Sequence, residues 1–189
     1  MKYLIIFISL CIVSCNAEST EKQTVATIAE EQLGQTPSVD TLKVFVDNQL
    51  TRIIKVDTTL SPQDAWYSIN SITVSEGYNH DVLLAAPKAK AKKVKVYLIP
   101  FREELSPIEL EERIDDIGFK LVDFVTLCDL NEQEMLLAMD YPNATQWRDE
   151  NGNTCYAAFA YFDRKKPCKG VAYREKNWST KWYFACVPK

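Results

Sequence analysis

The stretch TQWRDENGNTCYAAFAYF, residues 145–162, decides the fold of this chain. Its two ends, Thr145 to Arg148 and Thr154 to Phe162, are rich in aromatic and β-branched residues, which favour strands. Between them, Asp149 to Asn153 carries Gly152 and short polar side chains that form tight turns. The stretch therefore predicts a β-hairpin. A calcium loop explains the alternating Asp and Asn residues less well, because Gly152 comes too early for the EF-hand pattern.

Two further runs extend this hairpin toward the C-terminus. Lys169 to Arg174 and Lys181 to Val187 have the composition of strands, and Glu175 to Thr180 supplies a turn between them. We therefore expect an antiparallel β-meander in which Cys168 and Cys186 lie almost opposite each other.

Four cysteines remain after the N-terminal signal, all in the last third of the chain: Cys128, Cys155, Cys168 and Cys186. An even number of cysteines in an exported protein favours disulfides, and four cysteines allow three connectivities. We expect a bridge between Cys168 and Cys186, which leaves Cys128 for Cys155. Each unstrained bridge would contribute about 3 kcal/mol to stability.

Upstream of this region, strands alternate with short helices. Val94 to Ile99 is the clearest strand, and Arg52 to Val56 follows Leu42 to Val46 as the second arm of a hairpin. Two Leu-Ser-Pro tripeptides, beginning at Leu60 and Leu105, mark helix starts, because serine is a good N-cap and proline suits the first helical position.

The second of these starts is the stronger one. Ser106 and Glu109 have the spacing of a capping box, and Gly118 is placed to end the helix. Asn131 to Asp140 predicts another helix with Asn131 as its cap, whereas Phe119 to Cys128 is ambiguous between strand and helix.

These elements predict an α+β domain over residues 41–189, with a mixed or antiparallel sheet, two or three short helices and the C-terminal antiparallel β-meander. After removal of the signal, about 172 to 175 residues remain, which suits one compact domain. Residues 15–40 are polar and rich in Glu, Thr and Gln, so we expect them to form a flexible tether.

The first residues of the chain predict export. Lys2 supplies a positive charge, and Tyr3 to Val13 is an apolar run shorter than the roughly 20 residues of a membrane span. Ile12-Val13-Ser14-Cys15 resembles the lipobox of bacterial lipoproteins, whose cysteine is acylated, with palmitate for example, and becomes the new N-terminus. The resemblance implies a signal peptide at residues 1–14 and a lipid anchor on Cys15 at the bacterial cell envelope. The alternative is cleavage after Ala17, which would give a soluble secreted protein.

A looser pattern runs through the rest of the chain. It consists of Leu60-Ser61 after a strand, the strand Lys95 to Phe101 followed by Leu105-Ser106-Pro107 and a helix closed by Gly118, the Trp147-Arg148-Asp149 turn with Gly152, and Trp178 before a terminal lysine. This pattern, over most of residues 53–189, is similar to that of a family of small uncharacterised bacterial proteins. The resemblance implies no catalytic residue.

Several classes of function lack the residues that they need. His80 is the only histidine and has no nucleophile near it in the sequence, and Cys-x-x-Cys spacing is missing from the mature chain. We therefore expect no catalytic triad, no metal site and no cofactor. The net charge of −4, or −5 once Lys2 has left with the signal, disfavours nucleic acid as a partner.

Charged residues gather in two places. The acids from Glu103 to Asp116 accompany an amphipathic helix, so a solvated face explains them better than a catalytic carboxylate pair. Five lysines lie between Lys88 and Lys95. They suit either anionic lipid headgroups or a solvated loop leading into an edge strand that lysine protects, and we favour the second explanation.

Aromatic residues are densest in the last 34 residues. Much of this set must form core, and we expect one exposed ring, Trp178, to hold a protein or a glycan. The leading hypothesis is therefore a non-enzymatic, lipid-anchored envelope protein that binds a protein or glycan partner through Trp178, Trp182 and Tyr183. The alternatives are a glycan hydrolase with paired carboxylates and a purely structural role.

The anchor can be tested by the intact mass of the mature protein from native membranes. We expect a chain that begins at Cys15 and carries fatty acyl groups, because two or more acyl chains make anchoring durable. A chain that begins at Glu18 without acyl groups would show ordinary secretory cleavage instead.

Overall fold

A computed structural model describes residues 50–69, 73–162 and 165–189. The expected signal peptide at residues 1–14, the lipidation site Cys15, the tether at residues 15–40 and the strand from Leu42 to Val46 lie outside the described residues. Within the described ranges, the chain forms eight strands in a mixed sheet and five helices. The predicted α+β class is confirmed, with more helices than the two or three expected.

The elements have the following bounds. The strands are β1 (Leu50–Lys55), β2 (Thr73–Tyr78), β3 (Lys93–Pro100), β4 (Phe119–Leu121), β5 (Asn143–Arg148), β6 (Thr154–Phe162), β7 (Lys166–Tyr173) and β8 (Tyr183–Pro188). The helices are α3 (Pro62–Ser68), α4 (His80–Leu84), α5 (Pro107–Asp116), α6 (Phe124–Gln133) and α7 (Leu137–Asp140). None of the helices in this part of the chain is long and apolar enough to cross a membrane.

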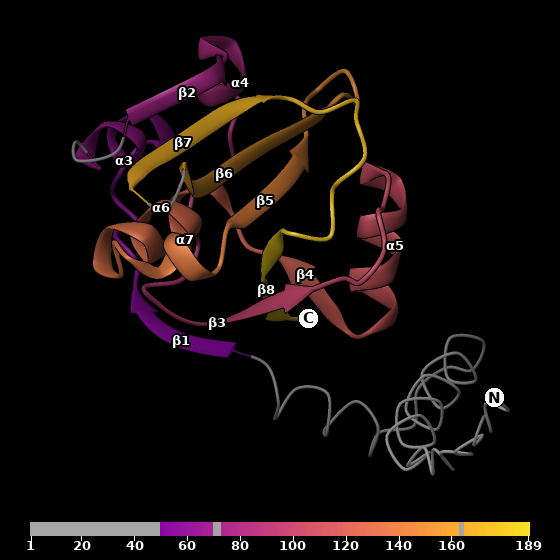
Figure 1. Ribbon diagram of the computed structural model, residues 1–189. Coiled ribbons are helices and arrows are strands. Elements are labelled where there is room, and N and C mark those ends of the chain that lie inside the picture. The colour runs from indigo at the N-terminus through magenta and orange to yellow at the C-terminus, as the bar shows by residue number, and fades with distance from the viewer. Residues whose placement is uncertain (1–49, 70–72, 163–164) are drawn as a thin grey trace, which may run out of the picture. The chain divides into compact units, whose positions relative to one another are not determined.

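One sheet joins these strands (Figure 1). Its order is β1-β3-β8-β5-β6-β7-β2, and the short β4 pairs with β8 beside this path. Neighbouring strands are antiparallel except that β8 runs parallel to β5 and β2 runs parallel to β7. The strands from the C-terminal third therefore occupy the middle of the sheet, with strands from the N-terminal half at both edges.

The predicted meander is confirmed for β5, β6 and β7. Trp147 on β5 lies opposite Cys155 on β6, and Ala157 on β6 lies opposite Val171 on β7. The turn from Asp149 to Asn153 is closed by Asp149, whose side chain accepts hydrogen bonds from the backbone N–H groups of Asn151 and Asn153 at 2.9 and 2.8 Å. Gly152 has a φ of 81°, which favours glycine.

The position predicted for the last strand is wrong. β8 does not pair with β7 but lies between β3 and β5. The connection that carries it there is held by Trp178, whose backbone exchanges hydrogen bonds of 2.7 and 3.2 Å with Leu105. Burial of the Trp178 ring outweighs the short antiparallel turn that the local sequence favours, because a large aromatic side chain contributes more to stability than a tight turn does.

This strand order also contradicts the expected disulfide between Cys168 and Cys186. Cys168 is on β7 and Cys186 on β8, and β5 and β6 lie between these strands. Three strand spacings amount to about 14 Å, whereas the Cα atoms of a disulfide are about 4.4–6.8 Å apart. Among the described residues, Cys128, Cys155, Cys168 and Cys186 are all free thiols.

Helices cover both faces of the sheet. α3, α4, α6 and α7 pack on one face, where Trp66, Phe124 and Phe159 are buried. α5 packs on the other face through Leu110 and Ile114. Figure 1 shows α5 on the right of the sheet, apart from the other helices. The sheet is therefore a middle layer, buried on both sides over most of its area.

The predicted helix starts are confirmed where the capping residues are local. The Ser61 hydroxyl accepts a hydrogen bond from the Asp64 N–H, and Ser106 and Glu109 form the expected capping box. The hydrogen bonds that Glu109 accepts from Ser106 lower the pKa of its carboxyl. Because both caps lie within four residues of the groups that they satisfy, the sequence alone predicts them.

The helix predicted from Asn131 to Asp140 is confirmed only in part, because residues 131–133 end α6 and Leu137–Asp140 form the separate α7. α6 begins earlier, at Phe124, with Asp123 as its N-cap. Asn131 is buried in this helix, where its side-chain amide exchanges hydrogen bonds of 2.7 and 3.1 Å with Asn143 on β5. Asn131, a residue type that favours helix N-caps, therefore joins α6 to β5 instead.

A lysine is buried in the same core. Lys169 on β7 is 4% exposed, and its ammonium donates hydrogen bonds to the backbone carbonyls of Trp66 and, at 3.0 Å, Ile69. It also lies 4.4 Å from the centroid of the Trp66 ring. Lys169 therefore satisfies carbonyl groups at the C-terminal end of α3 and fixes this helix to the sheet.

We expect Lys169→Met to lower the free energy of unfolding by about 1–3 kcal/mol, because buried carbonyls lose their donor. Burial lowers the pKa of Lys169 below the usual 10.5. Between the lowered pKa of the folded protein and 10.5, Lys169 is more protonated in the unfolded chain than in the folded protein. The free energy of unfolding therefore rises with pH across this window. The difference in the free energy of unfolding between native protein and variant, measured in urea, should therefore grow as the pH rises toward 10.5. Lys166→Met, on the exposed part of β7, is the control.

The free thiols give a second test, with iodoacetamide. Burial raises the pKa of all four cysteines, that of Cys155 to about 11, and Cys168 is the least buried. At pH 8 we expect Cys168 to react first in the folded protein, because the thiolate is the reactive form. In denaturant all four should react without reductant. Thiols that become reactive only after reduction would contradict this structure.

Candidate functional site

The structure places the three predicted binding residues in the core or against it. Trp178 is 1% exposed, and its Nε1–H donates a 2.7 Å hydrogen bond to Gln146 Oε1. The Arg174 guanidinium covers the same ring, 4.1 Å from the ring centroid. The expectation that Trp178 is an exposed ring is therefore wrong, because the ring fills the core beneath α5.

Trp182 and Tyr183 are half-buried and belong to different faces of the sheet. The Trp182 ring meets the edge of Trp178 at a centroid distance of 5.6 Å. The Tyr183 ring meets Tyr141 on the opposite face, at 5.2 Å. Trp178, Trp182 and Tyr183 therefore do not form one binding surface.

His80 lies in a polar chain on the surface. Its Nδ1 is 3.1 Å from the Tyr78 hydroxyl, which lies 3.1 Å from the Tyr67 hydroxyl. The hydrogen bond with Tyr67 raises the pKa of Tyr78 to about 12.

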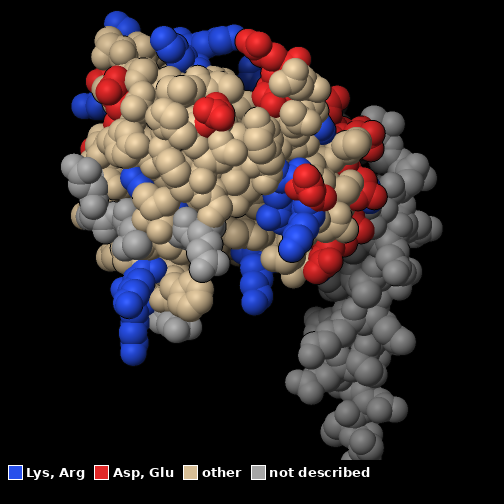
Figure 2. Space-filling view, turned by 90° about the horizontal axis from the view of Figure 1, so that it is seen from above, with Lys and Arg blue, Asp and Glu red and all other residues tan. Residues whose placement is uncertain are grey.

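Figure 2 shows the face above β2, α4 and β7 as a broad surface with few charged side chains. No group of three or more His, Cys, Asp or Glu in the described residues could hold a metal ion.

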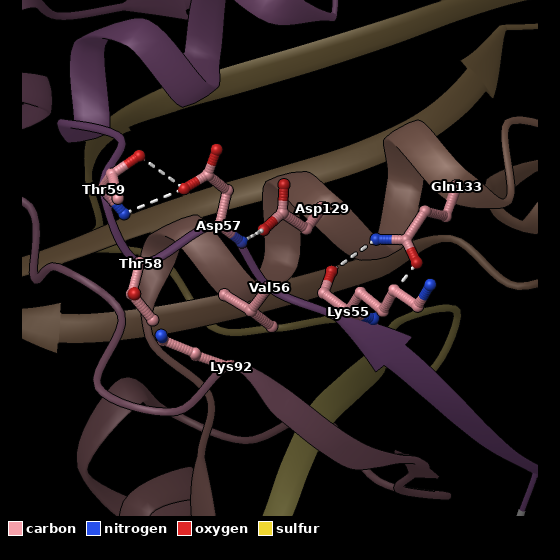
Figure 3. Close-up of a pocket in the computed structure, with 8 residues that line it drawn as sticks. All are labelled: Lys55, Val56, Asp57, Thr58, Thr59, Lys92, Asp129 and Gln133. Atoms are coloured by element: carbon pink, nitrogen blue, oxygen red, sulfur yellow. Dashed lines mark hydrogen bonds between the residues drawn. The ribbon is translucent and has the colours of Figure 1, made fainter.

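Two carboxylates share a hollow of about 510 Å³ beside α6 (Figure 3). Asp129 is 4% exposed, and its Oδ2 accepts a 2.9 Å hydrogen bond from the Asp57 N–H. Burial raises the pKa of Asp129, whereas hydrogen bonds from Thr59 lower the pKa of Asp57. Opposed pKa values in a carboxylate pair are what a hydrolase with a general acid and a base needs.

The same contacts also have a structural role. The Thr59 N–H and hydroxyl donate to Asp57 Oδ1 at 2.9 and 2.6 Å, and Gln133 exchanges hydrogen bonds with the backbone of Lys55. Asp57 and Asp129 thus hold the connection from β1 to α3 against α6. This hollow is open to solvent, and it is the weaker of the two candidate sites.

The stronger candidate is a groove of about 550 Å³ on the other side of residues 87–93. We call it the lysine groove. It lies between the start of β3, the short β4, the first turn of α6 and the C-terminal ends of β5 and β8. The residues that line it are Pro87, Lys88, Lys90, Ala91, Lys93, Val94, Lys95, Lys120, Leu121, Val122, Asp123, Thr126, Gln146, Trp147, Val187 and Pro188.

The charge of the lysine groove is almost entirely positive. Five lysines line it, and Asp123 is the one acid among the described residues that does so. Asp123 already accepts hydrogen bonds of 2.8 and 2.9 Å from the N–H and hydroxyl of Thr126 as the cap of α6. The net local charge of about +4 contrasts with the net −4 of the whole chain, so the groove is an electrostatic attractor for anions.

β3, which carries Lys93 and Lys95, is not an outer strand of the sheet as expected. It pairs with β1 along Lys93–Leu98 and with β8 at Tyr97–Pro100. The outer strand on this side is β1. Among the described strands, residues 93–96 pair with β1 alone, so the lysines flank one open side of β3 at the lysine groove.

The floor of the lysine groove is apolar. Val94, Leu121 and Val187 are half-buried there, beside the ring of Trp147. The Trp147 ring packs edge-to-face on Phe124, with a centroid distance of 5.8 Å. A concave site with an apolar floor and a few charged groups at its rim is the usual form of a ligand site.

This arrangement can bind an anion. The groove supplies cationic donors on different elements, since Lys93 belongs to β3 and Lys120 to β4. The sequence pattern indicates the lysines at 88–95 but not Lys120 and Trp147, which lie 25 and more residues away. The signal for Lys120 was hidden in the ambiguous stretch from Phe119 to Cys128.

Comparisons of the chain with protein-family models, with curated proteins and with solved structures give no match. The resemblance of residues 53–189 to a family of small bacterial proteins, like that of residues 12–15 to a lipobox, therefore stays a prediction.

Proposed function

We propose that this chain is a non-enzymatic binding module of the bacterial cell envelope, anchored by lipid on Cys15, and that it holds an anionic ligand in the lysine groove. The observation that supports this most is the convergence of lysines from β3, β4 and the 87–92 segment around one apolar hollow. Cleavage after Ala17 would remove the anchor but leave the groove unchanged.

The expected strength of binding follows from the number of lysines. Each lysine near an anionic ligand contributes about 1 kcal/mol at modest ionic strength. Five of them give about 5 kcal/mol, which corresponds to a Kd of about 0.1–1 mM for a small anion. Because these side chains are exposed, added salt should weaken the binding strongly.

The hydrolase alternative has one observation in its favour, the opposed pKa directions of Asp57 and Asp129. Both carboxylates are, however, bound within the fold by the hydrogen bonds described above. A binding module requires no such pair, so the lysine groove is the better basis for a function.

We expect the double variant Lys93→Gln, Lys120→Gln to bind tripolyphosphate about thirtyfold more weakly than the native chain, because two cationic contacts of about 1 kcal/mol each are lost. The measurement is isothermal titration of the full-length chain in detergent micelles with sodium tripolyphosphate, at low and high salt. These two lysines are chosen because Lys95 is partly engaged, 4.9 Å from the Tyr97 ring centroid.

The matched control is Lys176→Gln, Lys181→Gln, which removes the same charge from exposed positions outside the lysine groove. It should change the affinity less than twofold, since only a general charge effect remains. Equal losses in both double variants would remove the groove as the binding site. Release of reducing ends from an acidic oligosaccharide by the native chain but not by Asp129→Asn would instead support the hydrolase.

A further inference from the structure

We infer that the ligand of the lysine groove is an acidic saccharide, one sugar ring of which packs on Trp147. This inference rests on the proposed function and adds the class of ligand. It is argued from the floor of the groove, because the lysines at the rim do not distinguish one anion from another.

Trp147 can offer the groove carbon surface only, because its one polar side-chain atom is buried. The residue is half-buried and lines the groove, and its Nε1 is buried with no hydrogen-bond partner in residues 50–69, 73–162 and 165–189. The part of the side chain left to a ligand is therefore the apolar part of the indole ring. Such a surface suits the C–H face of a sugar ring, which loses little by leaving water.

The ring is also held in place before any ligand arrives. Trp147 lies on β5, an inner strand paired with β6, and opposite Cys155. Its ring packs on Phe124, which is fully buried at the start of α6. A ligand that stacks on Trp147 therefore loses little free energy to ordering the side chain.

The rim supplies what an acidic sugar needs besides the stacking surface. Lys93 and Lys95 on β3 and Lys120 on β4 line the groove together with Trp147. Their ammonium groups can pair with carboxylate, phosphate or sulfate substituents while the sugar hydroxyls stay in water.

Other anionic ligands fit this combination less well. A bilayer surface is flat, whereas the lysines surround a hollow of about 550 Å³. An acyl chain in a groove that is open on one side would leave much of its apolar surface in water. A bare phosphate chain makes no use of Trp147. A nucleic acid that extends beyond the basic groove meets a chain with a net charge of −4.

The experiment compares tetragalacturonate with its fully methyl-esterified form, using tryptophan fluorescence and titration calorimetry on the full-length chain in micelles. We expect Trp147→Leu to weaken tetragalacturonate binding about fivefold to tenfold, the range of an aromatic stacking contact. Tripolyphosphate binding should stay within twofold of the native value. The uncharged methyl ester should bind at least tenfold more weakly than the acid.

Two further variants keep the test independent of folding. Trp147→Phe retains the contact with Phe124 and should abolish the fluorescence change that tetragalacturonate causes. Trp182→Leu removes a half-buried tryptophan of the other core cluster and should leave both affinities unchanged. An equal effect of Trp182→Leu would indicate general destabilisation and overturn the assignment of Trp147.

The outcomes separate this inference from the proposed function. If tripolyphosphate binds through the lysines and Trp147→Leu affects neither probe, the saccharide is wrong and the anion site stands. Tighter binding of dodecyl phosphate or of tetrathymidylate than of tetragalacturonate would likewise replace the saccharide by a lipid or a nucleic acid. If neither tripolyphosphate nor tetragalacturonate binds, both proposals are wrong.

Discussion

The insertion of β8 between β3 and β5 is the constraint on which the rest of the structure depends. It joins strands from the first half of the chain to the C-terminal meander, and it is held by Trp178, which anchors the preceding connection to Leu105. The same insertion brings the end of β8 beside the start of β3, the short β4 and α6, and it thereby builds the walls of the lysine groove. The site is thus a product of long-range pairing rather than of a local motif.

The parts of the fold that the sequence predicts are those whose causes lie within a few residues. The capping box of Ser106 and Glu109 and the hairpin turn at Gly152 are encoded by neighbours, and both are confirmed. The start of α6 was missed because Asp123 caps it from within a run that also suits a strand. The place of β8 could not be predicted from its own residues, because it depends on the burial of Trp178 beside Leu105, which is 73 residues away in the sequence.

The candidate site also combines features that the sequence predicts with features that depend on long-range pairing. The lysines from 88 to 95 form a charged run in the sequence. Their role depends on the position of β3 in the sheet, which is fixed only by its pairing with β1 and β8. Trp147 is one of many aromatic residues in the C-terminal half and looks no different from Trp178 in the sequence. In the structure, Trp147 lines the lysine groove, whereas the Trp178 ring fills the core.

The antiparallel pairing of β1 with β3 has a mechanical consequence. Leu50, where the described chain begins, lies opposite Leu98, whereas the lysine end of β3 lies opposite Lys55 at the far end of β1. A pull between an anchor on the N-terminal side of Leu50 and a ligand held near Lys93 would draw the two strands past each other lengthwise. Hydrogen bonds along such a pair share the force instead of opening one after another. With the anchor and the ligand proposed above, this pairing would resist traction along the two strands.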